Sequence, residues 1–325
     1  MIQDPHELKR RSLLRLKSVS SPRPLIGPAT VQFHITDLCN LACQYCFYHG
    51  AGTTHRPSGK KYLPFDLFKG LVRDCLDLQV DTIYLSGQGE PTLHPRFYDM
   101  LRCLEPSFKV NIYSNGTFPI ERCRDILRSD HIVINLGEAD RESYRALTGG
   151  DLFIKVIKNI RELARLRPKF NPDFFIEVLF VMTRLNAENL LRTENLVLEL
   201  GADLVQKRKF EVSDFNRHLM LTDEEEKAKS TGGWLPCYFG WFNSAVEFNG
   251  DVNICCFMQS LTVGNAYKTS FKDVWGSDAY SRARILALRG EDPFRNDKAC
   301  AHCATTCQNK DIAAQMEMYD RVRKA

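Results

Sequence analysis

The feature that most constrains the fold is a repeated alternation of short apolar strands with longer amphipathic helices. Runs rich in β-branched and aromatic residues predict six strands, at 31–36, 82–86, 109–114, 131–136, 174–182 and 203–209. Helical patterns lie between them, at 64–79, 95–104, 119–128, 151–167 and 187–200. Because successive βα units place parallel strands inside a layer of helices, we expect an α/β fold, a partial (β/α)6 TIM-like barrel.

The length of the chain predicts a second, smaller unit, since 325 residues exceed the usual size of one domain. After an acidic, polar stretch at 211–233, the βα pattern gives way to aromatic residues, cysteines and short strands. We therefore expect an N-terminal extension at 1–30, the barrel at 31–210, a linker at 211–233, and a small α+β domain with a C-terminal helix at 234–325.

Composition and charge exclude several classes of protein. A net charge of +4 is too small to favour a nucleic-acid partner. No apolar run approaches the ~18 residues of a membrane-spanning helix, and the first residues lack the apolar core of a signal peptide. We therefore expect a cytoplasmic protein without a membrane partner, in which the 12 cysteines bind metal or fill the core rather than form disulfides.

Three cysteines, Cys39, Cys43 and Cys46, follow the first predicted strand. In parallel α/β folds, loops at this end of the strands carry the chemistry. Three thiolates so close together can hold three corners of a [4Fe–4S] cube and leave one iron open for a small chelating ligand. Zinc is the alternative metal, although it would need a fourth ligand from elsewhere in the chain.

With the aromatic Tyr45 before the third cysteine, this C-x3-C-x-aromatic-C segment resembles the signature of radical S-adenosylmethionine (SAM) enzymes, and residues 31–210 resemble their partial barrel. The resemblance implies that SAM chelates the open iron. One electron from the cluster would then cleave SAM to methionine and a 5'-deoxyadenosyl radical, which removes hydrogen from an unactivated C–H bond. It also implies an external one-electron donor such as flavodoxin or ferredoxin.

The "GQGEP" segment after the second predicted strand is similar to the second landmark of that family, a glycine-rich turn. The resemblance implies that Gly87, Gly89 and Glu90 hold the amine of the methionine moiety. Glycines let a backbone approach a ligand closely, and a carboxylate is a natural partner of an ammonium group. Many family members have glycine where this chain has Gln88, so the chain departs from the pattern at that position.

Polar residues after the third and fourth predicted strands extend the resemblance. Ser114 and Asn115 resemble the pair that meets the ribose or carboxylate of SAM. Asn135 and Arg145 stand where the family often has Ser-x-Asp and an arginine. Asn135 can replace a hydroxyl as a donor and Arg145 can pair with a carboxylate, but each is equally well explained as a solvated residue.

A second group of cysteines occupies the C-terminal part of the chain. Cys237 and Cys255 flank a predicted hairpin that turns at 249–251, and "CAHCATTC" follows at 300–307. This pattern resembles the SPASM/twitch extension of radical SAM enzymes, and implies one auxiliary [4Fe–4S] cluster bound by Cys237, Cys255, Cys300 and Cys303, with Cys307 as a further candidate ligand. Four thiolates suit zinc as well, so zinc stays open here.

Cys256 is left over beside a predicted cluster ligand. A thiol can donate a hydrogen atom to a carbon radical, and donation from the face opposite to abstraction gives epimerisation. The alternative is a buried apolar residue that points away from the cluster, because side chains alternate along a strand.

These patterns predict a radical SAM enzyme that acts on a small natural-product or carbohydrate-like molecule by dehydrogenation, epimerisation or decarboxylation. Polar residues of the last strands, Glu177, Lys207 and Lys209, are candidates to assist. One alternative is a maturase of a ribosomally made peptide; the 30 residues before the first strand are few for a peptide-recognition domain, which favours a small molecule. An alternative of another class is a non-catalytic protein that binds zinc and RNA.

Overall fold

The computed structural model confirms the predicted α/β architecture. It describes residues 4–19, 21, 23–53, 61–104, 106–210, 215–220, 236–256, 261–294, 300 and 306–324. Six parallel strands form one curved sheet with neighbours in sequence order: β1 (Thr30–His34), β2 (Thr82–Ser86), β3 (Lys109–Ser114), β4 (His131–Asn135), β5 (Phe175–Met182) and β6 (Leu204–Lys209). Each lies within two residues of its predicted bounds.

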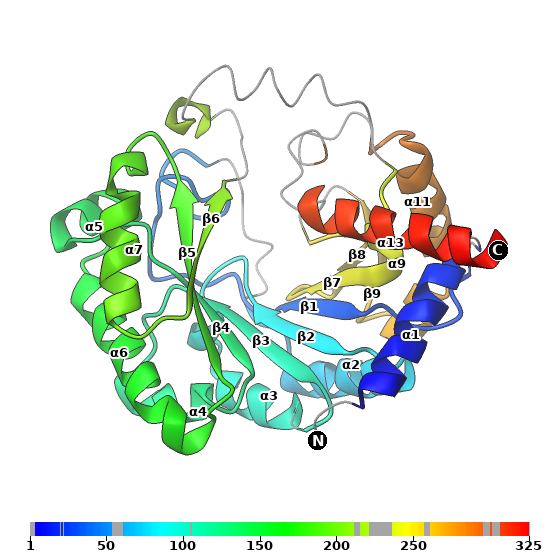
Figure 1. Cartoon of the computed structure of the whole chain (residues 1–325), viewed down its shortest axis with the longest axis horizontal. Helices are drawn as coiled ribbons and strands as arrows, with labels where there is room; N and C mark the ends of the chain where they lie inside the picture. The colour runs from blue at the N-terminus through cyan, green and yellow to red at the C-terminus, as the bar shows by residue number, and fades with distance from the viewer. Residues whose placement is uncertain are drawn as a thin grey trace.

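Helices cover the outer, convex face of this sheet (Figure 1). They are α2 (Phe65–Asp77), α3 (Phe97–Leu104), α4 (Cys123–Ile126), α5 (Arg141–Thr148), α6 (Phe153–Phe170) and α7 (Leu190–Glu199). Helix α5 lies outside the predicted ranges, and local chemistry explains it: the Asp140 side chain accepts a hydrogen bond from the Ser143 amide at its start. Gly149 ends it with a φ of 70°.

The C-terminal part continues the same sheet rather than forming a sheet of its own. Its elements are α9 (Phe239–Phe242), β7 (Asn243–Glu247), β8 (Asp251–Asn253), β9 (Thr262–Asn265), α10 (Phe271–Trp275), α11 (Asp278–Arg289) and α13 (Thr306–Lys324). Strand β7 lies parallel to β1, which gives a nine-stranded order of β6-β5-β4-β3-β2-β1-β7-β8-β9. The predicted hairpin is confirmed as the antiparallel pair β7–β8, whose turn contains Gly250 at a φ of +87°.

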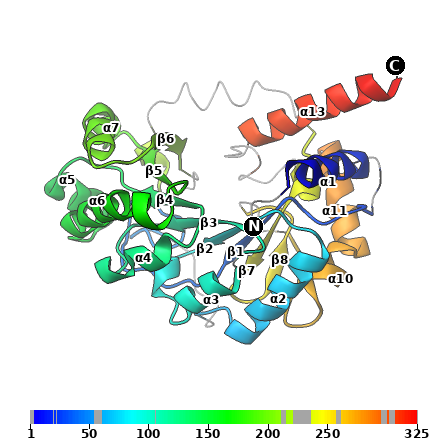
Figure 2. The same cartoon turned by 60° about the horizontal axis from the view of Figure 1, so that its bottom comes forward.

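The N-terminal helix α1 (Pro5–Ser18) packs beside the start of β2 and against the C-terminal helices α9 and α13 (Figure 2). Its Arg15 is 2% exposed and forms an ion pair with Asp81, beside the start of β2. Leu16 shares an apolar cluster with Trp241 of α9 and Ile312 of α13. None of the described helices is long and apolar enough to cross a membrane.

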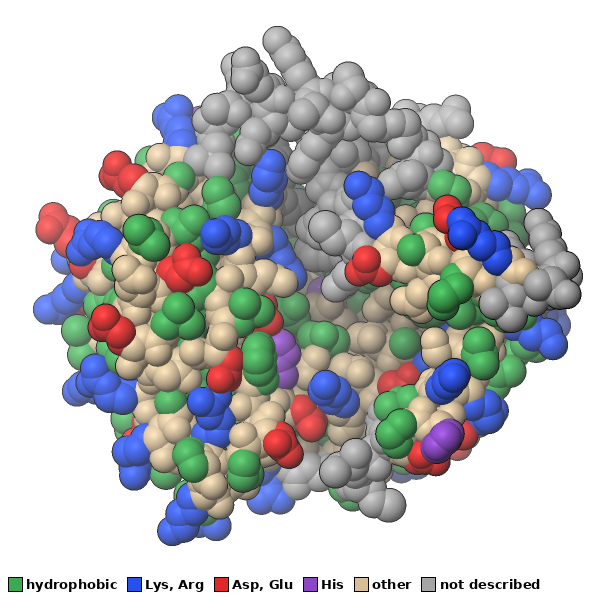
Figure 3. All heavy atoms as spheres, in the orientation of Figure 1, with side chains coloured by type: hydrophobic (Ala, Val, Ile, Leu, Met, Phe, Trp, Pro, Cys, Tyr) green, Lys and Arg blue, Asp and Glu red, His purple; other side chains and the backbone are tan. Residues whose placement is uncertain are grey.

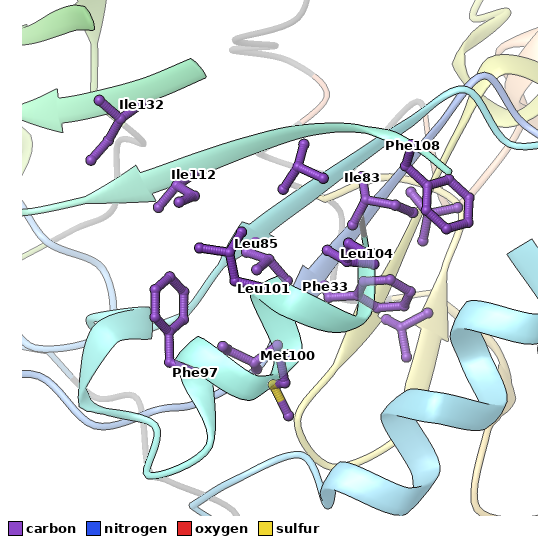
Figure 4. Packing of buried hydrophobic residues seen from close by; sticks show 14 of the residues in the cluster. Phe33, Ile83, Leu85, Phe97, Met100, Leu101, Leu104, Phe108, Ile112 and Ile132 are labelled. Carbon is purple, nitrogen blue, oxygen red and sulfur yellow. The ribbon is translucent and has the colours of Figure 1, made fainter. Parts of the chain in front are cut away.

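The main core lies between the sheet and its outer helices (Figure 4). Alternate strand residues point outward, so Phe33, Ile83, Leu85 and Ile112 are fully buried against α2 and α3. The residues between them point to the inner, concave face. The core therefore occupies the outer side, and the inner side remains for the site.

Candidate functional site

The loop that carries the cysteine triplet follows β1 at the carboxyl edge of the sheet. Cys39, Cys43 and Cys46 are each partly buried there. The amides of Ala42 and Gln44 donate hydrogen bonds to the carbonyl oxygens at the end of α5, each at 2.9 Å. The Cys46 sulfur accepts a hydrogen bond from the amide of His49 at 3.3 Å. Backbone contacts thus hold the loop in place.

The "GQGEP" turn after β2 packs directly against this loop. The amides of Gly89 and Glu90 donate hydrogen bonds to the carbonyl oxygens of Thr36 and Leu38, at 3.2 and 2.7 Å. A Cβ atom at Gly89 would overlap the Leu38 carbonyl, and one at Gly87 would lie 2.8 Å from the Thr36 oxygen. Both glycines are therefore required for close approach of the cysteine loop itself, a role that sequence reasoning did not identify.

Glu90 joins the turns after β2 and β3. Its carboxylate is 2% exposed and accepts hydrogen bonds from the Thr92 amide and hydroxyl, from the Ser114 hydroxyl at 2.9 Å, and from the Asn115 amide at 2.6 Å. Burial raises the pKa of Glu90, and these donors act against that shift. The carboxylate that was expected to meet an amine is thus extensively hydrogen-bonded within the protein.

A second set of hydrogen bonds ties the cysteine loop to the turn after β3. The Asn115 side-chain amide donates to Asn40 Oδ1 at 2.9 Å, and Asn40 Nδ2 donates to the Thr117 hydroxyl at 2.9 Å. Thr117 in turn donates to Asn115 Oδ1 at 2.6 Å. The structure brings Asn115 to the cysteine loop and Ser114 to Glu90. It adds Asn40, which had no sequence signal beyond its place between two cysteines.

Tyr45 crosses from the cysteine loop to β4. Its hydroxyl accepts a hydrogen bond from Asn135 Nδ2 at 2.8 Å, and its carbonyl oxygen accepts one from Asn216 Nδ2 at 3.0 Å. The ring belongs to an apolar cluster on the inner face, formed by Tyr45, Val133, Leu147, Leu179, Val181 and Leu219. Residues 215–220, expected within a linker, therefore pack against the site in the structure.

Arg145 is placed differently from the other expected cofactor residues. It lies on α5, and its side chain is exposed on the helix surface. Of the two explanations open from the sequence, the structure agrees with a solvated helix residue.

The three thiols share one electrostatic environment. Burial raises the pKa of Cys39 to about 11 and that of Cys43 to about 12, and negative charge on neighbouring thiolates adds to both shifts. A donor set of closely spaced, partly buried thiols fits a cationic iron centre, which compensates thiolate charge. Within the described part of the chain, no three Cys, His, Asp or Glu side chains form a group that could hold a metal ion, so the fit rests on the chemistry of these three thiols.

The inner face of the sheet is hollowed at the centre of the molecule (Figure 3). A buried polar network lines it where β1 meets β7: His34 Nδ1 lies 2.9 Å from Glu247, which also accepts hydrogen bonds from Gln88 at 2.9 Å and Asn253 at 3.2 Å. His34 also contacts Gln32. The alternation of Gln32 and His34 with apolar residues in "VQFHIT" was the signal that could have identified these residues.

Polar residues of the last strands divide between the two faces. Glu177 of β5 points inward and lies 3.1 Å from His131 Nε2. On β6, Arg208 points inward, and its guanidinium lies over the ring of Tyr113 on β3. Lys207 occupies the alternate, exposed position on that strand. The sequence analysis named Lys207 and Lys209 as candidates to assist the reaction, whereas the cation of β6 on the inner face is Arg208.

The auxiliary cysteines are described in part. Cys237, Cys255 and Cys300 are partly buried and pack against the main core. Cys303 and the side chain of Cys307 lie outside the described residues. Three of the four expected ligands thus border one core.

Cys256 is partly buried directly after Cys255. A hydrogen bond with Cys255 and burial raise the pKa of Cys256, and the charge of Glu247 adds to the shift. Charge on Cys256 also contributes to the raised pKa of Tyr84, an inner-face residue of β2 whose shift is due first to burial. Cys256 follows β8, whose Asn253 donates a hydrogen bond to Glu247 on the inner face.

Family models match two parts of the chain. The Radical SAM superfamily model matches residues 33–196, and a SPASM model, described as an iron–sulfur cluster-binding domain, matches residues 237–304. The two occur in the predicted order. A SAM-binding [4Fe–4S] cluster and auxiliary iron–sulfur chemistry are the cofactors that these domains imply.

One relative is similar in part of its sequence, and two solved structures are similar in fold. A probable GTP 3',8-cyclase of Methanosarcina mazei is 34% identical over 135 residues, which is 40% of each chain. The structure of SuiB from Streptococcus suis bound to SAM has a TM-score of 0.66 at 18% identity, covering 86% of this chain and 72% of SuiB; SuiB has also been solved with its precursor peptide SuiA. BtrN in complex with AdoMet and 2-DOIA has a TM-score of 0.51 at 16% identity, covering 84% and 92%.

The matches to individual proteins are partial in length or low in sequence identity. The match to the cyclase spans less than half of that relative's length, and the two solved structures share the fold at low identity.

Proposed function

We propose a function for a chain that belongs to the radical SAM superfamily, the family whose model matches half of its residues. In this proposal Cys39, Cys43 and Cys46 hold a [4Fe–4S] cluster that binds SAM, and the enzyme abstracts hydrogen from a small natural-product or carbohydrate-like substrate. Such a cluster supplies the electron that splits SAM into methionine and a 5'-deoxyadenosyl radical. The chain's own residues position the loop, enclose the site and bind the substrate.

The observation that carries the proposal is the attachment of the cysteine loop to two neighbouring turns. Glu90 fixes the turn after β3 to the turn after β2, and the latter binds the loop backbone at Thr36 and Leu38. Positions fixed in this way keep three ligands on one side of a metal centre and leave the other side open. In this proposal Gly87, Gly89, Ser114 and Asn115 form the adjoining wall for SAM.

The inner face supports a site from which water is excluded. Tyr45 spans from the loop to Asn135 and covers apolar residues of β4 and β5, such as Val133 and Leu179. A reactive carbon radical needs this protection, since an enclosed site prevents side reactions.

A small polar substrate is the favoured class because polar side chains from several strands converge on the hollow. Gln32, His34, Tyr84, Asn111 and Glu247 lie on neighbouring strands and all face inward. A few convergent polar groups in a concave site fix the orientation of a small ligand. A ribosomally made peptide is the second candidate, favoured by the fold shared with SuiB, which has been solved with its precursor peptide.

The place of Cys256 favours epimerisation among the three candidate outcomes. Cys256 follows β8, whose Asn253 bonds to Glu247 on the inner face, and in this proposal its thiol donates a hydrogen atom to a substrate radical in the hollow. The Cys256→Ala variant should form 5'-deoxyadenosine and lose the epimerised product. Unchanged product from this variant would exclude the thiol as the donor.

Deuterium transfer tests the proposed function. Reconstituted protein is incubated anaerobically with dithionite, SAM and a panel of deuterated sugars, aminocyclitols and short peptides, and 5'-deoxyadenosine is analysed by mass spectrometry. We expect deuterium from a small polar compound to appear in 5'-deoxyadenosine. The Cys43→Ala variant should show none, and Cys103→Ala, on outer helix α3, should match the wild type. Deuterium from peptides alone would replace the substrate class with the second candidate.

A further inference from the structure

Arg208 is a cation on the inner face that reaches across the hollow. It lies near the carboxyl end of β6, the edge that also carries the cysteine loop. Its guanidinium carbon is 6.0 Å from the centre of the Tyr113 ring, although three strand-to-strand steps separate β6 from β3 in the sheet. Its Nη2 donates a hydrogen bond to Gln206 Oε1 at 3.0 Å. Lys and Arg side chains border the hollow on this side (Figure 3).

The other buried or partly buried arginines are held by carboxylates or by backbone carbonyl oxygens. Arg11 and Arg15 pair with Asp81, and Arg167 pairs with Asp203. Arg284, which has no ion pair among the described residues, donates hydrogen bonds to the carbonyl oxygens of Gly240 and Trp275. Within the described residues, no carboxylate forms an ion pair with Arg208. Arg208 is partly buried. A partly buried cation without a counter-ion is unfavourable, and such violations concentrate at functional sites.

The nearest inward-facing carboxylate on the adjacent strand has another partner. Glu177 of β5 lies 3.1 Å from His131 Nε2. Burial is the main cause of the raised pKa values of Tyr84 and Tyr113. The charge of Glu177 raises both values further, and the charge of Arg208 lowers them. Glu177 therefore shares the environment of Arg208 without neutralising it.

Beside Arg208 the inner face carries a pair of stacked aromatic rings and a buried acceptor without a partner. The rings of Tyr84 and Tyr113 stack with centroids 5.6 Å apart and an angle of 25°. Asn111, 5% exposed, has a buried Oδ1 atom with no hydrogen-bond partner in the structure. A buried acceptor without a partner costs stability, so it is suited to a donor that arrives with a ligand.

We infer that Arg208 binds an anionic group, a carboxylate or phosphate, of a small substrate that lies beside the stacked rings of Tyr84 and Tyr113 and donates a hydrogen bond to Asn111. The planar guanidinium matches both oxyanions in a bidentate arrangement. This assignment of substrate class rests on the proposed function, because it uses the same hollow. The inference also disfavours neutral sugars and neutral peptides as substrates.

The test compares two charge removals on one strand. Arg208→Met and Lys207→Met each remove one positive charge from adjacent residues of β6, but only Arg208 faces the hollow. Holoprotein with SAM is titrated calorimetrically with inorganic pyrophosphate and, separately, with glutarate. We expect one of the two anions to bind wild type and Lys207→Met equally, and to bind Arg208→Met at least about tenfold more weakly. Arg208→Lys, which keeps the charge but loses the bidentate geometry, should be intermediate.

Three results would overturn the inference. They are binding of neither anion by the wild type, equal loss in the Lys207→Met variant, and a comparable loss of SAM affinity in Arg208→Met, which would assign the guanidinium to the carboxylate of SAM. Formation of 5'-deoxyadenosine by the wild type, measured in parallel, separates this inference from the proposed function. Anion binding without 5'-deoxyadenosine would leave Arg208 as an anion site and refute the function.

Discussion

The outer and inner faces of the sheet use alternate residues of the same strands for different purposes. On β1, Val31 and Phe33 point outward and are fully buried under helices, whereas Gln32 and His34 point inward and form polar contacts. On β2, Leu85 lies outward, and Tyr84 inward. The period of two that defines a strand therefore separates stability from chemistry residue by residue.

This difference teaches that neighbouring positions should respond differently to mutation. Outer residues contribute through apolar burial and close packing, so their loss leaves a cavity. Inner residues retain polar groups that are costly to bury, and natural chains keep such groups where a site requires them. Variants that change one face at a time can separate the two contributions.

Truncation on the outer face should have the largest effect on stability. Phe33→Ala removes a fully buried ring that stacks edge-on against Phe68, with centroids 5.4 Å apart. It should lower the free energy of unfolding by about 3–5 kcal/mol. Gln32→Ala, one residue away on the inner face, should cost about 1 kcal/mol. Urea unfolding followed by circular dichroism measures both, and equal losses would contradict the separation of faces.

Variants at the carboxyl edge of the sheet, where the loops follow the strands, should have the next largest effect on stability. Glu90→Ala leaves the buried donors of Thr92, Ser114 and Asn115 without their acceptor, which should cost about 1–3 kcal/mol and weaken SAM binding. Ser114→Ala removes a single donor and should cost less. Thermal unfolding and SAM titration report the two effects. If Glu90→Ala bound SAM normally, the anchoring role of this carboxylate would be refuted.

A buried carboxylate at the same edge should give a pH-dependent effect. Burial raises the pKa of Glu138, after β4, to about 7 from 4.5, and Asn189 donates a hydrogen bond to it at 2.8 Å. Since the folded state favours the neutral form, the associated stability is present below pH 4.5 and is lost as pH rises through about 7. Glu138→Gln should therefore stabilise the protein at pH 8, by about 1–2 kcal/mol, and not at pH 4. Melting temperatures at both pH values test this, and an equal change at both would contradict it.

The smallest effect is expected on the exposed side of α5. Arg145→Ala removes a solvated side chain and should change neither stability nor SAM binding by more than about 0.5 kcal/mol. A matched change at Arg141, which pairs with Asp151 on the surface, serves as the control. Loss of SAM affinity in Arg145→Ala alone would return this residue to the cofactor site.

The sequence predicted the parts of this molecule that depend on local patterns. Apolar periodicity located the six strands β1 to β6, and cysteine spacing located the loop after β1. The Asn-Gly turn predicted the β7–β8 hairpin. These features follow from neighbouring residues, so periodicity and spacing suffice to find them.

The parts that escaped prediction depend on contacts between distant residues. The pairing of β7 with β1 and the contact of His34 with Glu247 join residues more than 200 positions apart. The role of Gly89 depends on Leu38, and the inward direction of Arg208 depends on the register of β6 with β5. Spacing along the chain carries no record of such contacts, and only the folded sheet reveals which polar residues share the hollow.

The central claim is that the loop after β1 holds an iron–sulfur cluster that cleaves SAM. The most direct test is 5'-deoxyadenosine formation by anaerobically reconstituted protein with dithionite and SAM, measured together with iron content. The account predicts a brown protein with about eight irons per chain, four for each cluster, and 5'-deoxyadenosine that disappears when Cys39, Cys43 and Cys46 are changed to alanine together, with loss of about four irons. A colourless zinc protein, or undiminished 5'-deoxyadenosine from the triple variant, would contradict it.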